Sequence, residues 1–442
     1  MKKAIYTLLA LFIAQQSWAQ DIDKIITKDY VDRLIKTLSS DDMQGRATFS
    51  PGIDKAATFI EKEFKSIGLQ PLEGKTYRQT FYKYQVKPQS AVLSLDGKAI
   101  AATDIFVFGN TAAKLSFNQE KGKIVQMDTG KPFMQQFRAL TKDAQQQIVL
   151  VDPALASDFK RLQAYVAGGS VIDEKELNTE SAATVFVLTA QTGVKNFQVE
   201  LNNNVEKMPL FNVAGTIPGK SKAKELVIFS GHYDHLGIMK ADGQDSIANG
   251  ADDDASGTTA MIALAKYYKK LNNNERTLIF VAFTAEEIGG FGARHFSEKL
   301  NPDDVVAMFN IEMIGKEAKF GKNSAFITGF ERSDFGEILQ RNLEGSVFRF
   351  HPDPYPEQQL FFRSDNATLA RLGVPAHTIS TDQIDTDSLY HTVNDEVESL
   401  DIQNITNTIE AIAKSAVSII DGKDTPTRIQ PESLAPGSAK KP

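Results

Sequence analysis

Residues 226–257 read LVIFSGHYDHLGIMKADGQDSIANGADDDASG, and this stretch joins a predicted strand to a predicted helix. The apolar run 226–229 is typical of a buried strand. The small residues 255–257 lead into a long apolar stretch that favours a helix, and two histidines and six aspartates lie between the two elements. Imidazole and carboxylate groups at a strand end and a helix start indicate a metal site.

From position 208 onward, apolar runs typical of strands alternate with amphipathic runs typical of helices. The predicted strands cover 226–230, 278–283, 305–311, 325–328 and 376–380. The predicted helices cover 256–271, 289–299, 333–343, 365–372 and 401–420. This alternation predicts an α/β fold in which helices cover both faces of a central sheet. Ligands of such folds bind beyond the carboxyl ends of the strands.

The N-terminal third of the chain predicts a different organisation. Residues 20–83 read as helical, with amphipathic helices expected over 29–38 and 54–67. Residues 84–208 contain several strand-like runs and no histidine. We expect a β-rich inserted domain of roughly 120 residues there, which could be a lid, a wall that limits substrates, or inert packing. The catalytic domain is then expected over 209–422.

Both ends of the chain carry segments expected to lie outside the folded domains. Residues 1–19 have a basic start, an apolar core and the small-x-small pattern Ser17-Trp18-Ala19, as in a signal peptide. The apolar part is too short for a bilayer span of about 20 residues. We therefore expect an exported protein, periplasmic or secreted, without stable membrane insertion; a short membrane anchor is the alternative. The tail 423–442 is rich in Pro, Ser and Lys and is predicted to be disordered.

The composition is that of an ordinary globular enzyme. The chain has 442 residues, 42% of them hydrophobic, and a formal net charge of −7 with a pI of about 5.6. A net negative charge argues against a nucleic-acid partner. The absence of cysteine excludes disulfides and thiolate chemistry.

Groups able to bind metal recur where predicted strands end or helices begin, and all six histidines lie between positions 232 and 391. These positions are His232-Tyr233-Asp234-His235, Asp252-Asp253-Asp254, Glu286-Glu287, Glu312, and Tyr390-His391 after a loop with Asp385 and Asp387. Each alone is more typical of a hydrogen-bonded rim residue or a solvated turn. The paired glutamates, however, follow a very apolar strand, where two ionised groups need a compensating cation.

Such a set of residues suits a site with two metal ions. Two divalent ions about 3.5–4 Å apart need a bridging carboxylate together with carboxylate and imidazole ligands at each end. Two histidines and three carboxylates meet that requirement. A further carboxylate without a metal bond would carry a proton from water to the leaving amine.

These motifs together resemble the co-catalytic di-zinc aminopeptidases, the exported bacterial leucyl-type family of metallopeptidase clan MH. The resemblance rests on GHYDH at 231–235, NGADDDASG at 249–257, AEE at 285–287, NIEMIG at 310–315, SDN at 364–366 and YHTVND at 390–395. Residues 39–71 also look like the helix pair with which that family begins. The family fold is a three-layer α/β/α domain with a central mixed sheet, and many relatives carry a protease-associated insert where residues 84–208 stand.

The resemblance implies two zinc ions per chain. His232, Asp253 and Glu312 would hold one ion, and Asp253, Glu287 and His391 would hold the other, with Asp253 as the bridge. Manganese or cobalt could replace zinc at a site of mixed imidazole and carboxylate ligands.

The resemblance also implies roles for three further residues. Glu286 would be the general base, and Tyr390 would lean towards the developing oxyanion. Asp234 would orient His232 through its second ring nitrogen.

Three positions depart from the family pattern. The family most often has Asp where Glu312 stands, Asn where Asp254 stands, and SDH where this chain has Asn366. A longer side chain at 312 could shift the first zinc, and a carboxylate at 254 adds negative charge near the site.

Several other positions keep more than one interpretation. His235 could be a residue that supports a metal ligand, a rim residue, or a ligand in place of His232. The loop 44–52 could reach the active-site rim or be a surface connector. His295, His351 and His377 are expected to be structural.

The expected activity is that of a zinc-dependent exopeptidase, which hydrolyses the N-terminal peptide bond of peptides or proteins with a metal-bridging water and Glu286 as base. A carboxypeptidase is one rival, and it would need a cation for the substrate carboxylate; Arg363 is the only one near a late motif. A glutaminyl cyclase would use one zinc and tryptophan-lined walls, yet the sole tryptophan is Trp18. A non-catalytic binding module would require a missing ligand or base, and none is missing.

Overall fold

The computed structural model describes residues 22–142, 145–177 and 182–430, and its chain divides into two compact units. Unit 1 comprises the described parts of Met1–Phe81 and Leu210–Pro442, and unit 2 comprises those of Tyr82–Pro209. The predicted signal segment 1–19 and residues 431–442 of the predicted tail lie outside the described residues. Among the described residues, no helix combines the length and apolar composition needed to cross a bilayer.

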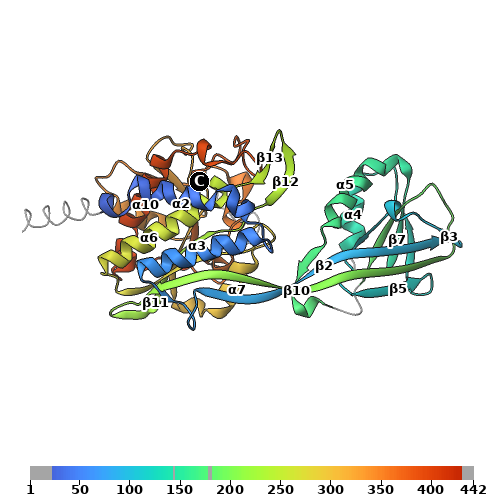
Figure 1. Cartoon of the computed structure of the whole chain (residues 1–442), viewed down its shortest axis with the longest axis horizontal. Coiled ribbons are helices and arrows are strands. Elements are labelled where there is room, and N and C mark those ends of the chain that lie inside the picture. Colours follow the sequence, from blue (N-terminus) through green and yellow to red (C-terminus); the bar gives the residue numbers. More distant parts are fainter. Residues whose placement is uncertain (1–21, 143–144, 178–181, 431–442) are drawn as a thin grey trace, which may run out of the picture. The chain divides into compact units, whose positions relative to one another are not determined.

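Unit 1 is built on a mixed sheet with strand order β17-β16-β18-β15-β11-β14-β10; Figure 1 labels β11 and β10 of this sheet. Its strands are β17 Arg349–Pro352, β16 Ser324–Ile327, β18 Ala376–Ser380, β15 Val305–Ile311, β11 Lys222–His232, β14 Arg276–Phe283 and β10 Phe197–Ile217. The four central strands β18, β15, β11 and β14 are parallel, whereas β10 pairs antiparallel with β14 and β16 antiparallel with β18. The predicted α/β fold with a central mixed sheet is confirmed.

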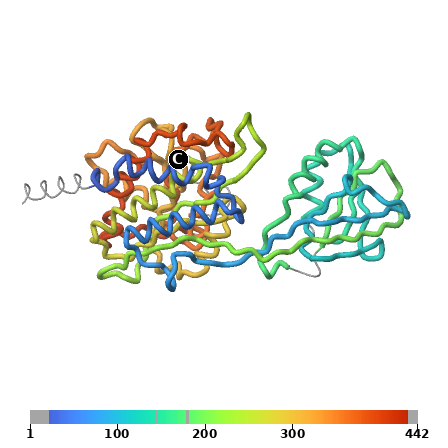
Figure 2. Tube along the Cα trace, in the orientation of Figure 1, coloured from blue at the N-terminus to red at the C-terminus, as the bar shows by residue number. Residues whose placement is uncertain are grey.

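Helices cover both faces of this sheet, because successive strand residues point to opposite sides. In β11, Val227 and Phe229 belong to one buried apolar cluster and Ile228 belongs to the other. The first cluster packs against α2 Lys28–Leu38, α3 Pro51–Ile67, α6 Gly257–Leu271, α8 Phe335–Asn342, α10 Ile402–Ser415 and α11 Val417–Ile420. The second cluster packs against α7 Phe291–Lys299 and α9 Asn366–Ala370. Figure 2 shows α2 and α3 next to α6, although they are far apart in the sequence.

One edge of the sheet collects the ends of its parallel strands. His232 at the end of β11 pairs with Phe283 at the end of β14, and β15 ends beside them at Ile311. A π-helical turn, Ala251–Ser256, leads directly into α6 at the same edge. A hairpin of β12 Gly237–Asp242 and β13 Asp245–Ala248 separates β11 from this turn. Every predicted metal-binding motif except the one at Tyr390-His391 therefore follows a strand or precedes a helix at this edge.

Unit 2 has its own sheets and cores. Four strands are ordered β4 Ile105–Phe108, β9 Thr184–Leu188, β7 Gln147–Val151 and β6 Lys123–Gln126. Two helices, α4 Phe133–Lys142 and α5 Ala156–Ala167, contribute apolar side chains to one of its cores. The remaining strands are β2 Arg78–Leu95, β3 Lys98–Ala99, β5 Lys114–Asn118, β8 Ser170–Ile172 and part of β10. The chain enters unit 2 along β2 and returns along β10.

The start of the predicted disordered tail is ordered, so that part of the prediction is wrong. Arg428 donates hydrogen bonds from its guanidinium to the carbonyl oxygens of Pro302 (3.1 Å) and Val305 (2.9 Å). The amide of Ile429 donates to the carbonyl of Gly373 at 3.0 Å, and the Ile429 side chain is buried in the second apolar cluster. The contacts of Arg428 and Ile429 therefore order this part of the chain, although the composition of residues 423–430 is typical of a disordered segment.

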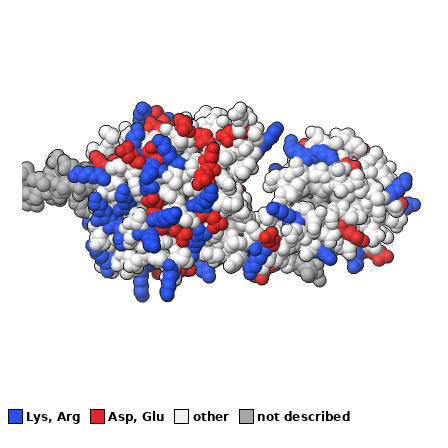
Figure 3. All heavy atoms as spheres, viewed as in Figure 1, with Lys and Arg blue, Asp and Glu red and all other residues white. Residues whose placement is uncertain are grey.

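Charged side chains of both signs are interspersed on the face of unit 1 shown in Figure 3. Among the described residues, two arginines have fully buried side chains, Arg46 and Arg276. Arg46 follows the N-terminal helix α2 and lies in a 3-10 turn, Asp41–Arg46. The interpretation of this loop as a surface connector is therefore wrong.

Arg46 joins the N-terminal segment to the loops that carry the metal-binding motifs. Its Nε donates to the carbonyl oxygen of Tyr233 at 2.8 Å, beside His232. Its two terminal nitrogens donate to the carbonyl oxygens of Leu38 (2.7 Å), Asn249 (2.5 Å) and Gly250 (2.9 Å). One buried guanidinium thus satisfies four carbonyl groups from three segments.

Replacement of Arg46 by lysine should destabilise unit 1 by about 3 kcal/mol or more, because a single ammonium cannot reach all four buried carbonyls. Urea unfolding followed by far-UV circular dichroism would measure the change. Arg161→Lys is the matched control, since the Arg161 side chain is 72% exposed. Equal stability of the two variants would contradict the bridging role of Arg46.

Candidate metal centre

Asp253 lies at the middle of the site, and its two carboxylate oxygens face two different imidazoles. Oδ1 is 3.1 Å from Nε2 of His232, and Oδ2 is 3.2 Å from Nε2 of His391. Asp253 is only 2% exposed. It belongs to the π-helical turn before α6, which brings it opposite the end of β11. A carboxylate shared in this way is the arrangement that bridges two ions.

The first side of the site consists of His232, Asp253 and Glu312. Potential ligand atoms of these three residues all lie within 4.8 Å of one another. His232 comes from the end of β11, and Glu312 follows β15. In the described part of the chain, His232 Nε2 and Glu312 Oε2 are both buried without a hydrogen-bond partner. Two buried polar atoms without a hydrogen-bond partner, next to the Asp253 carboxylate, fit the ligands of a cation.

The second side consists of Asp253, Glu287 and His391, with His235 beside them. Nε2 of His391 is 3.2 Å from Oδ2 of Asp253 and 3.2 Å from Oε2 of Glu287. Nδ1 of His235 lies 2.8 Å from Oε1 of Glu287, but 3.8 Å from Asp253. His391 therefore contacts both carboxylates as a ligand would, whereas His235 orients Glu287 through its other oxygen.

His235 thus supports a proposed ligand, Glu287, which is one of its expected interpretations, and it does not take the place of His232. The structure places it beside Glu287, on the opposite side of Asp253. A second histidine three positions after the first, just beyond the strand end, was the available signal. Its side could not be inferred, because the chain leaves the sheet at Tyr233.

The donor spacing fits zinc. Donors about 2.0 Å from a tetrahedral zinc lie roughly 3.3 Å from one another, by the geometry of a regular tetrahedron. The three imidazole–carboxylate distances are 3.1, 3.2 and 3.2 Å. The donor atoms are imidazole nitrogens and carboxylate oxygens, which are ligands that zinc accepts.

Asp234 holds the turn that carries Glu286 and Glu287. Its buried carboxylate accepts hydrogen bonds from the amides of Glu286 (3.1 Å) and Glu287 (3.3 Å). The second ring nitrogen of His232 lies 3.1 Å from the Asp234 carbonyl oxygen and 3.9 Å from the carboxylate. Asp234 thus contacts the second ring nitrogen of His232 as expected, but it does so mainly through its backbone carbonyl, because its carboxylate is used by the glutamate turn.

Glu286 and its neighbours form a crowded set of carboxylates. Burial, together with the charges of Glu312, Asp365 and Glu287, holds the pKa of Glu286 well above its ordinary value. Burial likewise raises the pKa of Glu312 to about 7. Burial lowers the pKa of His391, but its contacts with Asp253 and Glu287 outweigh it and raise the value to about 10. A cation bound among the carboxylates would favour their ionised forms.

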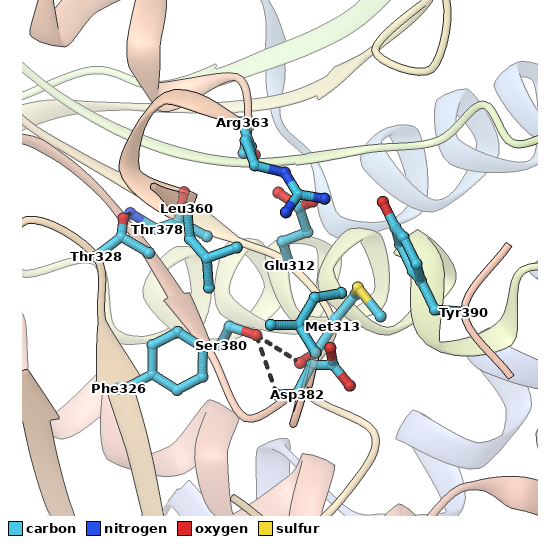
Figure 4. Close-up of a pocket in the computed structure, with 12 residues that line it drawn as sticks. Glu312, Met313, Phe326, Thr328, Leu360, Arg363, Thr378, Ser380, Asp382 and Tyr390 are labelled. Carbon is cyan, nitrogen blue, oxygen red and sulfur yellow. Dashed lines mark hydrogen bonds between the residues drawn. The ribbon is translucent and has the colours of Figure 1, made fainter. Parts of the chain in front are cut away.

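Tyr390 lines a pocket next to the first side of the site. Figure 4 shows Tyr390 across from Glu312 and Arg363, and Met313 and Leu360 line the same pocket. The Tyr390 ring stacks on His391 with ring centroids 3.9 Å apart. Burial and the charges of Asp253, Glu287 and Glu312 raise its pKa, so the phenol keeps its proton and stays a hydrogen-bond donor.

The departure at Asp254 has a structural explanation. Its carboxylate accepts hydrogen bonds from the amides of His232 (3.0 Å), Gly257 (3.0 Å) and Met313 (3.2 Å). Asp254 therefore joins the end of β11 to the start of α6 and to the turn after β15. The peptide bond between Asp253 and Asp254 is cis.

The remaining singled-out residues lie apart from the ligand set. Asn366 donates to the carbonyl oxygens of Phe361 and Ala376 and accepts from Thr378. His377 contacts Ser333 and Thr328, whereas His295 and His351 stack on Phe81 and Phe320. Asp365 belongs to the SDN motif, and the sequence predicts no role for it. It is buried, and its charge adds to the effect of burial in raising the pKa of Glu286.

Comparison with known proteins shows similarity to peptidases. A family profile described as "Peptidase family M28" matches residues 212–416. A probable leucine aminopeptidase of Trichophyton verrucosum is 30% identical over 245 residues, which is 52% of this chain and 62% of the relative. Aminopeptidase YwaD of Bacillus subtilis is 22% identical over 239 residues, covering 50% of this chain and 47% of the relative. The chain thus matches about half to three fifths of the length of these relatives.

Solved structures share the fold over most of the chain. An aminopeptidase from Aneurinibacillus sp. strain AM-1 superposes with a TM-score of 0.56 at 19% identity, covering 90% of this chain and 95% of the other. A zinc aminopeptidase from Bacillus subtilis superposes with a TM-score of 0.54 at 17% identity, covering 90% and 96%.

Proposed function

Residues 212–416 belong to peptidase family M28, and from that premise we propose that the chain is a zinc-dependent aminopeptidase with two zinc ions. Its substrates would be the N-termini of peptides or proteins. The single observation that carries this proposal is the position of Asp253, whose two oxygens each meet a different imidazole at about the donor spacing of tetrahedral zinc. His232, Asp253 and Glu312 would hold one ion, and Asp253, Glu287 and His391 the other.

Zinc, when bound, would polarise the scissile carbonyl and make water more acidic. Glu286 would take a proton from the attacking water and pass it to the leaving amine. The hydrogen bonds from the glutamate turn to Asp234 fix the backbone of Glu286 for that task. The protonated phenol of Tyr390, at the pocket wall opposite Glu312, would donate to the oxyanion that develops from the carbonyl.

The pocket next to Glu312 is mostly apolar at depth, with Met313, Phe326, Leu360 and Ile384 among its lining residues. We propose that it receives the side chain of the N-terminal residue, and that the carboxylates at its mouth favour the free α-ammonium group. The predicted signal segment supports an exported, periplasmic or secreted enzyme.

A carboxypeptidase is the second candidate, because Arg363 lines the same pocket and could bind a substrate carboxylate. A glutaminyl cyclase is less well supported, since the described residues that line the pocket include no tryptophan. The complete set of ligands and a base argues against a purely binding function.

Digestion of a peptide library by the zinc-loaded protein, read by mass spectrometry, would test the proposal. We expect release of single residues from the N-terminus, preferentially apolar ones, and loss of the activity after treatment with a zinc chelator. Peptides blocked by N-terminal acetylation are the matched control and should remain intact. Release of C-terminal residues would favour the carboxypeptidase, and conversion of N-terminal glutamine without hydrolysis would favour the cyclase.

A further inference from the structure

A second group of carboxylates lies outside the proposed set of zinc ligands, although one of its members, Asp382, also lines the pocket next to Glu312. Asp252, Asp382 and Asp387 place one oxygen each within 4.8 Å of the others. Asp252 is in the turn before α6, and the other two are in the segment after β18. Their side chains are 0%, 3% and 5% exposed. Three buried carboxylates at one point require compensation by positive charge or by protons.

Several of these oxygens are unsatisfied. Within the described residues, both oxygens of Asp382 are buried and have no hydrogen-bond partner, and neither has Oδ2 of Asp252. The other oxygen of Asp252 accepts from the amide of Gly315 at 2.7 Å. Figure 4 shows how the backbone of Asp382 is fixed, since its amide donates to Ser380, which itself donates to the carbonyl of Met313. These hydrogen bonds fix the backbone of Asp382, and one of its carboxylate oxygens lies within 4.8 Å of Asp252 and Asp387.

Lys316 compensates only part of this charge. Its ammonium lies 2.5 Å from Asp387 and 3.4 Å from Oδ2 of Asp252. In the part of the chain that the structure describes, these are the ion pairs of Lys316, and none reaches Asp382. One ammonium thus pairs with two of the three carboxylates. Burial and the charges of Asp252 and Asp387 raise the pKa of Asp382 to about 8.

We propose that Asp252, Asp382 and Asp387 form a binding site for a hard divalent cation of the calcium class. All donors here are oxygens, which Ca²⁺ prefers, and the site lacks the imidazole nitrogens found around Asp253. Three carboxylates supply between three and six oxygens, depending on how many bind through both atoms, and water would complete the coordination shell.

Such an ion would connect two segments that carry zinc ligands. Asp252 precedes Asp253, whereas Asp382 and Asp387 lie in the segment that continues to Tyr390 and His391. Asp395 already joins these segments, because its carboxylate accepts from the amides of Asp252 and Asp253. The cation would add a second connection and hold His391 against Asp253. Its binding does not depend on the proposed peptidase activity.

The test is calcium binding by the zinc-loaded full-length protein, with calcium and zinc measured together by mass spectrometry after equilibrium dialysis. We expect one calcium per chain with unchanged zinc, and none in Asp382→Asn. Asp385→Asn is the matched control, since Asp385 is exposed in the same loop, and it should keep the calcium. At about one hundred times Kd, calcium should raise the Tm of the wild type by roughly 3–5 °C.

A second variant keeps the proposal testable if Asp382→Asn does not fold. Lys316→Met removes the competing ammonium, so this variant should be less stable without calcium, bind calcium more tightly than the wild type, and regain stability when it is added. If instead Lys316 and a proton on Asp382 neutralise the cluster, the wild type binds no calcium and its Tm does not respond. That result, or calcium uptake only with loss of zinc, would overturn the proposal.

Discussion

Replacement of Glu286 by glutamine should leave the zinc content unchanged and lower kcat by a factor of about 10² to 10⁴. Glutamine has the size and shape of glutamate, but it cannot accept a proton from water. Glu286 is not among the residues that place an oxygen next to His232 or His391, so its replacement leaves the proposed ligand set intact. KM should change far less than kcat, because the lost interaction belongs to the transition state.

Zinc content by mass spectrometry and initial rates on an aminoacyl-nitroanilide would measure this outcome. Glu298→Gln on the exposed side of α7 is the matched control and should behave as the wild type. Retention of more than one tenth of the activity by Glu286→Gln would rule out Glu286 as the general base. Loss of zinc from this variant would instead show that Glu286 is itself a ligand.

Replacement of Asp253 by alanine should remove zinc from both positions and reduce activity to background. Asp253 provides one oxygen to the His232 side and the other to the His391 side. Without it, each ion would keep only one carboxylate and one imidazole, fewer than the three protein ligands of typical catalytic zinc sites. Asp253→Ala should lower the zinc content more than Glu286→Gln does, because Glu286→Gln leaves all proposed ligands in place.

Zinc stoichiometry of the purified variant, determined beside its Tm, would check this prediction. Asp303→Ala is the control, because Asp303 is exposed and precedes β15, whereas Glu312 follows the other end of that strand. Activity alone does not test the prediction, because unfolding of the variant would also abolish activity. A folded variant with two zinc ions would contradict the bridging role. A folded protein with one zinc would show that the two sides bind independently.

The sequence predicted the fold of unit 1 well because its signals are local. The strand β15 was expected over 305–311 and ends at Ile311 as predicted, since seven buried residues in a row leave little ambiguity. The long strand β10 was not recognised, because its alternating burial at Gln198 to Leu201 gives way to a polar stretch before the apolar part begins. Helix α4 was also missed, with only Phe133 and Phe137 of its face buried.

The sequence predicted which residues belong to the candidate site, but not which of them contact one another. Motif spacing selected Asp253 and Glu287, whereas the side on which His235 lies depends on the path of the chain after Tyr233. Arg46 could not be assigned a role, because its four carbonyl partners lie up to 204 positions away in the sequence. A backbone carbonyl can accept such a hydrogen bond whatever its residue type, so the accepting positions cannot be recognised from the sequence.

The four hydrogen bonds of Arg46 also set an order of events during folding. The arginine is synthesised about two hundred residues before Asn249 and Gly250, and His391 follows much later still. Contacts between such distant positions form late, because the closure of long loops is entropically costly. Metal uptake should therefore report the completion of unit 1: a chain that holds zinc has already brought its beginning and its end together.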